Sequence, residues 1–490
     1  MALRRTLTLM LCAITGASLV ATAVPSSAAP GFTISPLRTS DSIQSTSGFV
    51  VHLKDRSASA QRVRTAHAAS AMQATSTSLR GLVDRAAKVR GAHVTESLAR
   101  ANHSMSFPAS QGLNATAAKA FASEIERNPE VESVEPVLHM TINENTGVHP
   151  AAVSSAPNDQ YWNRQWGLNS ENGIDAPGAW ATNTGSGVTV AVIDSGITKH
   201  PDLDGKVLPG YDFISDRYAA GDGNGRDSDP SDEGDWTRAG ACTRRDVPSS
   251  WHGTHVAGII GAATNNARGV AGAAPGAKIL PVRALGHCGG TDVDIADGIT
   301  WASGGEVPGV PTNHNPAKVI NLSLGGPSNY CPITYQRAID AAVSRGSPVV
   351  VAAGNEALDV RKSTPGNCRT VVVVRGTGET GAQSYFSTYG TPVDVSAPGG
   401  DDRTGDMILS TLNNGETTPA APTYGYMEGT SQAAPHVSAV VALMIAANPN
   451  LTPARIKEIL KQSVNPAKCK TGCGTGIVDA RKAVKAAKSA

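Results

Sequence analysis

Runs of consecutive β-branched and other apolar residues recur in the C-terminal two thirds of the chain. Such runs, which lack a polar residue at every second position, are typical of parallel strands buried on both faces. They predict strands at residues 187–193, 278–282, 318–322, 348–352 and 370–374. Stretches with the composition of helices lie between them, at residues 252–263, 292–303 and 333–345. Strands alternating with helices predict an α/β fold with a doubly wound, mostly parallel sheet.

The N-terminal third has a different pattern. Short apolar runs predict strands and Ala-rich stretches predict helices, in the order strand 49–53, helix 57–90, helix 115–127 and strand 131–137. This order predicts a small α+β domain over about residues 47–142. Residues 144–157 are rich in Pro, Ser and Ala and form a linker, the kind of segment that proteases cut.

The first 29 residues have the pattern of an export signal. Arg4 and Arg5 precede a mostly apolar stretch, and Ser27-Ala28-Ala29 is a plausible cleavage site. The alternative is a membrane anchor, but the apolar stretch is short and small polar residues interrupt it. No later run has about 18 uninterrupted apolar residues. We therefore expect a secreted, extracellular protein that has no membrane contact after signal removal.

Net charge and cysteine count indicate which partners and cross-links to expect. The formal net charge is +1, so no overall attraction to nucleic acid is expected. Six cysteines remain after signal removal, and an even number in an exported protein predicts three disulfides. Fifteen pairings are possible, and paired CxxC spacings, which would indicate metal binding, are absent. We propose these pairs: Cys242–Cys288, Cys331–Cys368 and Cys469–Cys473.

Three separate motifs carry an Asp, a His and a Ser. Asp194 lies at the carboxyl end of a predicted strand, where sites on open α/β sheets form. His252 opens the helical segment His-Gly-Thr-His-Val-Ala-Gly, and Ser431 begins a run that looks helical as far as residue 447. Taken singly, the Asp and the Ser would be turn or helix-cap residues. Together they supply a nucleophile, its base and the group that orients the base.

Acyl transfer also needs donors for an oxyanion. Asn355 follows a predicted buried strand and is the expected side-chain donor, with the Ser431 backbone N–H as the second. His255 is expected to be structural, because one base suffices. A metal site made by the two histidines is not expected, because HExxH is absent and the two histidines are only three residues apart.

With these motifs, the chain resembles the subtilisin family of serine endopeptidases. The matches are Val-Ile-Asp-Ser-Gly at Asp194, His-Gly-Thr-His-Val-Ala-Gly at His252, Ala-Ala-Gly-Asn at Asn355, and Gly-Thr-Ser-x-Ala-x-Pro-His at Ser431. The resemblance implies a subtilisin-like fold over about residues 156–485. Gln432 departs from the family, which usually has methionine there.

The resemblance also implies a specificity pocket and a zymogen. Its substrate-binding walls would be Leu322, Ser323, Leu324, Gly325 and Gly326 on one side and Ala352, Ala353 and Gly354 on the other. Glu356 could lie at the rim and favour basic side chains, or Glu356 and Asp359 could both face water. Residues 30–155 would be a propeptide with a ferredoxin-like inhibitor and chaperone domain, and residues 156–490 the catalytic domain. We expect a monomer that acts on proteins and peptides and cuts itself between about Met140 and Pro157, with the segment after Val137 lying in the substrate cleft as an added strand.

The Gly-rich segment 222–235 contains several Asp residues and one Glu. Carboxylate oxygens suit Ca²⁺, and the resemblance adds support for a structural calcium held by Asp222, Asp227, Asp229 and Asp232. Asp159 and Asp202 are further candidates. The alternative is a solvated acidic loop.

Two other functions compete with a secreted, autoprocessed endopeptidase. A catalytically inactive binding protein on the same fold is disfavoured, because the three motif residues and Asn355 are all present. An α/β-hydrolase esterase would need G-x-S-x-G and the order Ser-Asp-His, whereas this chain has the order Asp-His-Ser.

Overall fold

The apolar runs of the sequence form the middle of a nine-stranded sheet, in the order β19-β20-β16-β15-β13-β11-β7-β9-β8. Neighbouring strands are parallel from β8 to β20, and β19 is antiparallel to β20. The strands are β7 (Thr189–Asp194), β8 (Tyr211–Asp212), β9 (Lys278–Arg283), β11 (Val319–Leu322), β13 (Val349–Ala352), β15 (Val372–Thr377), β16 (Val395–Pro398), β19 (Val464–Asn465) and β20 (Ile477–Val478). The predicted doubly wound, mostly parallel sheet is confirmed.

The computed structural model describes residues 45–65, 71–89, 97–142, 146–147, 157–469 and 472–490. The predicted export signal lies outside the described residues. Residues 39–490 cluster by their contacts into one unit.

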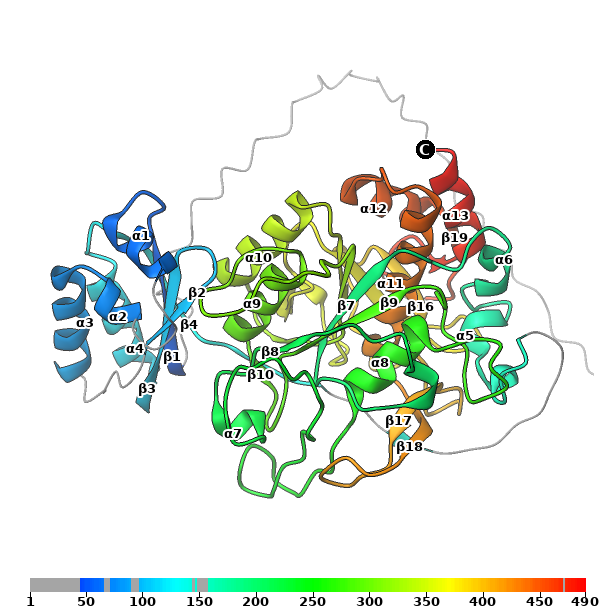
Figure 1. The fold of residues 1–490 in the computed structure, drawn as a ribbon, viewed down its shortest axis with the longest axis horizontal. Coiled ribbons are helices and arrows are strands. Elements are labelled where there is room, and N and C mark those ends of the chain that lie inside the picture. The colour runs from blue at the N-terminus through cyan, green and yellow to red at the C-terminus, as the bar shows by residue number, and fades with distance from the viewer. Residues whose placement is uncertain (1–44, 66–70, 90–96, 143–145, 148–156, 470–471) are drawn as a thin grey trace, which may run out of the picture. The chain divides into compact units, whose positions relative to one another are not determined.

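Alternate residues of each strand face opposite layers, because side chains point to opposite faces of a sheet. Val190 and Val192 pack in the cluster that contains α8 (His252–Gly261) and α11 (Thr430–Ala447). Ala191 and Ile193 pack in the cluster that contains α9 (Asp292–Ala302) and α10 (Ile333–Ser344). Helices therefore cover both faces of the sheet (Figure 1).

Helix α11 lies in the core. Among the described residues it is the one helix that is long and apolar enough to cross a membrane. Because 89% of it is buried inside the protein, it has the character of the core helix of a globular domain.

The N-terminal elements form a separate four-stranded antiparallel sheet in the order β2-β3-β1-β4. The strands are β1 (Ser45–Leu53), β2 (Leu98–Arg100), β3 (Ser104–Asn114) and β4 (Val131–Pro136). The helices are α1 (Ala58–Thr65), α2 (Ala71–Ala74), α3 (Thr77–Val89) and α4 (Ala115–Ile125). This order is that of the predicted ferredoxin-like arrangement. The single helix predicted at 57–90 is wrong, because its described parts form three helices.

Smaller elements complete the fold. Short strands pair β5 (His139–Met140) with β10 (Gly290–Thr291), β12 (Gly326–Pro327) with β14 (Ser363–Thr364), and β17 (Ile408–Asn413) with β18 (Pro422–Met427), which also pairs with β6 (Thr146–Gly147). The remaining helices are α5 (Trp166–Asn169), α6 (Ala176–Trp180), α7 (Arg217–Ala220), α12 (Pro453–Gln462) and α13 (Ala480–Lys488), with 3-10 turns at Trp162–Arg164, Pro201–Leu203 and Val360–Lys362. Disulfides join Cys242 to Cys288, Cys331 to Cys368 and Cys469 to Cys473, the pairs proposed from the sequence.

Candidate active site

Asp194 and His252 meet at the carboxyl end of the central sheet. Asp194 is the last residue of β7, and His252 is the first residue of α8. His252 Nδ1 donates a hydrogen bond to Asp194 Oδ1 at 2.6 Å, and both side chains are 0% exposed. The Ser195 backbone N–H donates to the same oxygen at 2.7 Å. The imidazole therefore carries its proton on Nδ1, which leaves Nε2 as the basic nitrogen.

Ser431 is the second residue of α11, at the positive end of a long helix dipole. Its hydroxyl donates to the Ser323 carbonyl oxygen at 3.1 Å. The Ser323 hydroxyl donates in turn to the Ser431 carbonyl oxygen at 2.7 Å. Asn321 and Ser438 extend this network behind Ser323. The serine predicted as nucleophile is thus tied to the segment that follows β11.

The orientation of the Asn355 amide is fixed by Thr430. Asn355 Oδ1 accepts the Thr430 backbone N–H at 2.9 Å and the Thr430 hydroxyl at 2.8 Å. Since the oxygen faces Thr430, the Nδ2 donor points elsewhere, and it lies 3.3 Å from where a Cβ on Gly429 would be. The amide hydrogens are therefore on the side of the chain that leads into Ser431.

The predicted substrate walls follow two adjacent strands. β11 and β13 are parallel neighbours with Leu322 opposite Val351, so the segments 322–326 and 352–354 leave the sheet side by side. The carboxylate of Glu356 lies against Gly354, since a Cβ there would be 2.7 Å from Oε2. Asp359 does not share this position, because it pairs with the Arg361 guanidinium at 2.7 Å.

His255 is a structural residue. Its Nε2 lies 3.1 Å from the carbonyl oxygens of both Ile408 and Gly425, where it can donate, so the ring joins α8 to β17 and β18. Burial, together with the charge of His252, lowers the pKa of His255 to about 3. The side chain is therefore neutral at ordinary pH, and its contacts are those of the structural residue expected from the sequence.

Comparisons with known proteins identify the family of this chain. The profile of the subtilase family, Peptidase S8, matches residues 185–476, which is more than half of the chain. An extracellular protease of Xanthomonas campestris pv. campestris is 50% identical over 388 residues, which cover 77% of this chain and 63% of that protein. An extracellular basic protease of Dichelobacter nodosus is 44% identical over 375 residues, covering 74% of this chain and 59% of that protein. The chain thus spans about three fifths of the length of these two relatives.

The chain belongs to the subtilase family. A solved structure of a protease from Pseudoalteromonas arctica is 52% identical and has a TM-score of 0.66, and the match covers 68% of this chain and 100% of that chain. The family therefore accounts for both the fold and the order of the motifs.

The four aspartates predicted to hold calcium bond different partners in this subtilase. Asp222 and Asp227 accept hydrogen bonds from Asn224, and Asp229 accepts two from Ser231. Asp232 is buried and accepts the Ser195 hydroxyl. Among the described residues, these four do not belong to the group of possible metal ligands whose atoms lie within 4.8 Å of one another. Calcium binding by this loop stays a prediction. Asp159 and Asp202 are also engaged, with backbone and side-chain donors of the segment 265–270.

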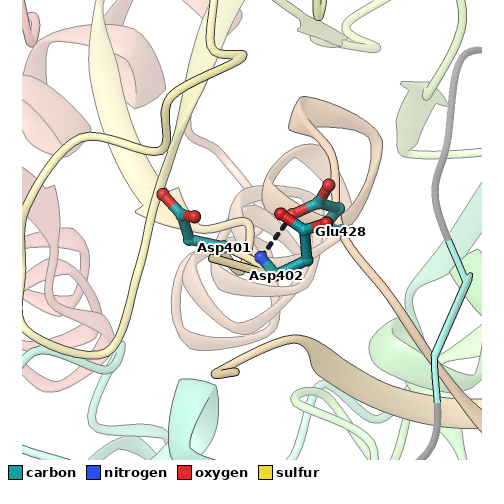
Figure 2. Close-up of side chains that lie close together, drawn as sticks. All are labelled: Asp401, Asp402 and Glu428. Carbon is teal, nitrogen blue, oxygen red and sulfur yellow. Dashed lines mark hydrogen bonds between the residues drawn. The ribbon is translucent and has the colours of Figure 1, made fainter. Parts of the chain in front are cut away.

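A different acidic group converges beside the start of α11. Among the described residues, the one set of three possible metal ligands consists of Asp401, Asp402 and Glu428, whose ligand atoms lie within 4.8 Å of one another. Figure 2 shows the bond from the Asp402 backbone N–H to Glu428 Oε2. Glu428 Oε1 also accepts the Tyr385 hydroxyl, and Asp401 accepts two backbone N–H groups. The three carboxylates suit Ca²⁺ by chemistry, and internal donors bind oxygens of Asp401 and Glu428.

The sequence analysis did not predict that Asp232 and Asp235 bond the serines next to Asp194 and His252. Asp232 bonds Ser195, and Asp235 bonds Ser250, two residues before His252. The signal was present in the spacing Asp-x-x-Asp, but it was assigned to a metal loop. Only the fold shows that this loop returns to the end of β7.

Proposed function

We propose that this chain is a secreted serine endopeptidase whose catalytic residues are Asp194, His252 and Ser431. The observation that carries the proposal is the buried 2.6 Å hydrogen bond between His252 Nδ1 and Asp194 Oδ1. This bond holds the imidazole in the tautomer that a general base needs. Secretion is supported by the predicted export signal and by the names of the two extracellular relatives.

The reaction is acyl transfer in two halves. The Ser431 hydroxyl turns from the Ser323 carbonyl toward His252, gives its proton to Nε2, and attacks the carbonyl carbon of the scissile peptide bond. His252 then gives that proton to the leaving amine. Water repeats the sequence on the acyl-enzyme, with His252 again acting as base, and releases the acid product.

Two donors would stabilise the tetrahedral intermediates. The Asn355 amide hydrogens and the Ser431 backbone N–H lie on the same side of the turn before α11. Donors that are already oriented need no reorganisation when charge develops on the oxygen, which is why they lower the barrier. The Thr430 contacts of Asn355 supply this orientation.

The segment after β4 supports an extended polypeptide as substrate. Met140 pairs with Gly290 in β10, and the Thr141 backbone N–H donates to the Gly325 carbonyl oxygen at 3.1 Å. Residues 139–141 therefore form the middle strand between two segments of the catalytic domain, as a bound peptide does in strand addition.

The pairing of the segment after β4 also supports an autoprocessed zymogen, with residues 30–155 as propeptide and 156–490 as catalytic domain. Thr146 and Gly147 pair with the end of β18, and the chain runs from there into the start of α11, which carries Ser431. Thr141 and Gly325 pair in antiparallel register. A substrate chain bound in that register would place the residue two positions after the one at Thr141 opposite Ser323. The Ser323 carbonyl oxygen accepts the Ser431 hydroxyl, so the cut should fall at that residue. The corresponding bond is Asn143–Glu144, and we expect the first cut there, with trimming to the 155/156 boundary afterwards.

Two measurements test this proposal. Matured protein should hydrolyse a denatured protein, and the full-length variant Ser431→Ala should not. Purified alone, Ser431→Ala should stay uncut after signal removal, whereas a brief incubation of the wild type should give an N-terminus at Glu144. Efficient processing of the pure variant would exclude self-cleavage.

Specificity is proposed to be broad, with large apolar residues accepted and basic ones preferred to acidic ones. The position of Glu356 beside Gly354 supports a weak attraction for Lys or Arg, screened by water and salt. Glu356→Gln should lower the Lys/Glu preference ratio in matched peptides at low salt. An unchanged ratio would remove Glu356 from the pocket.

Calcium is proposed as a structural ion only. The support is the convergence of Asp401, Asp402 and Glu428. Chelation should then lower the Tm of the matured enzyme, and the calcium dependence of Tm should be smaller in Glu428→Gln. A Tm independent of calcium would contradict the proposal.

A further inference from the structure

The hydroxyls of Ser195, which is buried, and Ser250, which is half-buried, supply acceptors at the start of α8. The first N–H groups of a helix have no partner within the helix, and Trp251, which precedes α8, makes no side-chain cap. The Gly253 N–H donates to Ser195 Oγ at 3.0 Å, and the His252 N–H donates to Ser250 Oγ at 3.3 Å.

Each of these hydroxyls is held by a carboxylate from one loop. Ser195 Oγ donates to Asp232 Oδ2 at 2.6 Å. Ser250 donates to Asp235 twice, from its backbone N–H at 2.6 Å and from its hydroxyl at 2.7 Å. At 2.6 and 2.7 Å, the two hydroxyl-to-carboxyl bonds are at the short end of the range for O–H···O hydrogen bonds. The carboxylates therefore fix the two hydroxyls, and the hydroxyls fix the end of α8 that carries His252.

Asp232 is buried and Asp235 is half-buried, so keeping both carboxylates charged in one loop is costly. Burial, together with the like charge of Asp235, raises the pKa of Asp232 to about 7, and burial also raises the pKa of Asp235. The charged groups that face the pair are Arg283 from β9 and His252 from α8. Such a costly arrangement near reacting groups is a reason to look for a role in the reaction.

We propose that Asp232 and Asp235 are positioning residues that hold the end of β7 and the start of α8 at the separation required by the Asp194–His252 hydrogen bond. Asp232 acts through Ser195, which directly follows Asp194. Asp235 acts through Ser250. This inference rests on the proposed function, because it presupposes that Asp194 and His252 act in catalysis.

The test uses the full-length chain, with each variant matured in trans by a trace of wild-type enzyme. The variants are Asp232→Asn, Ser195→Ala, their double variant and Asp235→Asn, and kcat is referred to active sites counted by burst titration. Asp232→Asn and Asp235→Asn should each lower kcat about tenfold while KM changes less than about twofold, because substrate contacts remain and only the base is misplaced. Glu233→Gln, which removes a charge from the same loop, should leave both constants near wild type.

The double variant decides whether Asp232 acts through Ser195. If it does, the double variant should lose no more kcat than the worse single variant. Losses that multiply, or a rise in KM with kcat unchanged, would overturn the proposal. Failure of the proposed function would look different, because peptide turnover would then survive in Ser431→Ala.

Discussion

At the residue scale, the chemistry depends on side chains whose neighbours leave them one useful orientation. His252 is oriented by Asp194, and Asn355 is oriented by both donors of Thr430. An amide whose oxygen is already bound can aim only its hydrogens at a developing oxyanion. The role of Asn355 therefore depends on Thr430 as well as on its own position after β13.

Asn355→Ala should lower kcat by a factor of about 10²–10³, the range found for the corresponding donor of subtilisin, with a smaller effect on KM. The reason is that the lost hydrogen bond forms mainly in the transition state. Steady-state kinetics on a chromogenic peptide measure both constants, and circular dichroism controls for folding. A variant that loses affinity but keeps its kcat would contradict the assignment.

At the element scale, long loops carry residues that the catalytic strands and helices need. The Cys242–Cys288 disulfide ties the insertion before α8 to the segment after β9, and this insertion carries Asp232 and Asp235. The bond closes a loop with a sequence separation of 46, against 4 for Cys469–Cys473. Loop-closure entropy makes the long link about 2 kcal/mol more stabilising than the short one.

Removing Cys242–Cys288 by a double Ser substitution should cost roughly 3–4 kcal/mol of unfolding free energy. Removing Cys469–Cys473 in the same way should cost much less, which makes it the matched control. Thermal melts of inactive Ser431→Ala proteins give both values without self-digestion. Equal losses would show that loop entropy does not govern these two links.

The sequence predicts elements well where local pattern and burial agree. The runs at β7, β9, β11, β13 and β15 are buried on both faces, so their composition alone indicates strands. The Ala-rich stretch at 57–90 suits a helix throughout, and composition does not show where it breaks. The partners of Asp232 follow from neither pattern, because they depend on tertiary contacts between loop, strand and helix.

At the scale of the whole molecule, the N-terminal domain satisfies helix ends of the catalytic domain. Glu135 accepts the backbone N–H groups of Ile333 and Thr334 at the start of α10, both at 2.9 Å. Arg100 pairs with Asp294 and Asp297 of α9. The proposed propeptide is thus bound to the rest of the chain partly through hydrogen bonds and ion pairs, which can dissociate without any covalent change.

The pH dependence of this contact should be set partly by Asp292, whose Oδ1 accepts the Leu138 N–H. Burial, with the charge of Glu135, raises the pKa of Asp292 well above its usual value. A carboxyl group whose pKa is raised in the bound state favours binding when it is protonated. The bound state is therefore most stable below the ordinary Asp pKa of about 4, and it loses stability as pH rises toward the raised pKa. In full-length Ser431→Ala, hydrogen-exchange protection of the Ile333 and Thr334 amides should therefore fall from pH 5 to pH 8, beyond the change in intrinsic exchange.

Asp292→Asn should flatten that pH dependence, since the amide does not titrate. Asp340→Asn, an exposed carboxylate on α10, should leave it as in the parent protein. A slope that is the same in the Asp292 and Asp340 variants would contradict the role given to Asp292.

The most direct test of the central claim is covalent trapping of the nucleophile. Matured protein should react with a fluorophosphonate at one residue, and peptide mass spectrometry should place the adduct on Ser431. We predict that Ser431→Ala blocks the reaction and that His252→Ala slows it greatly. An adduct on another serine, or full labelling of the Ser431→Ala protein, would contradict it.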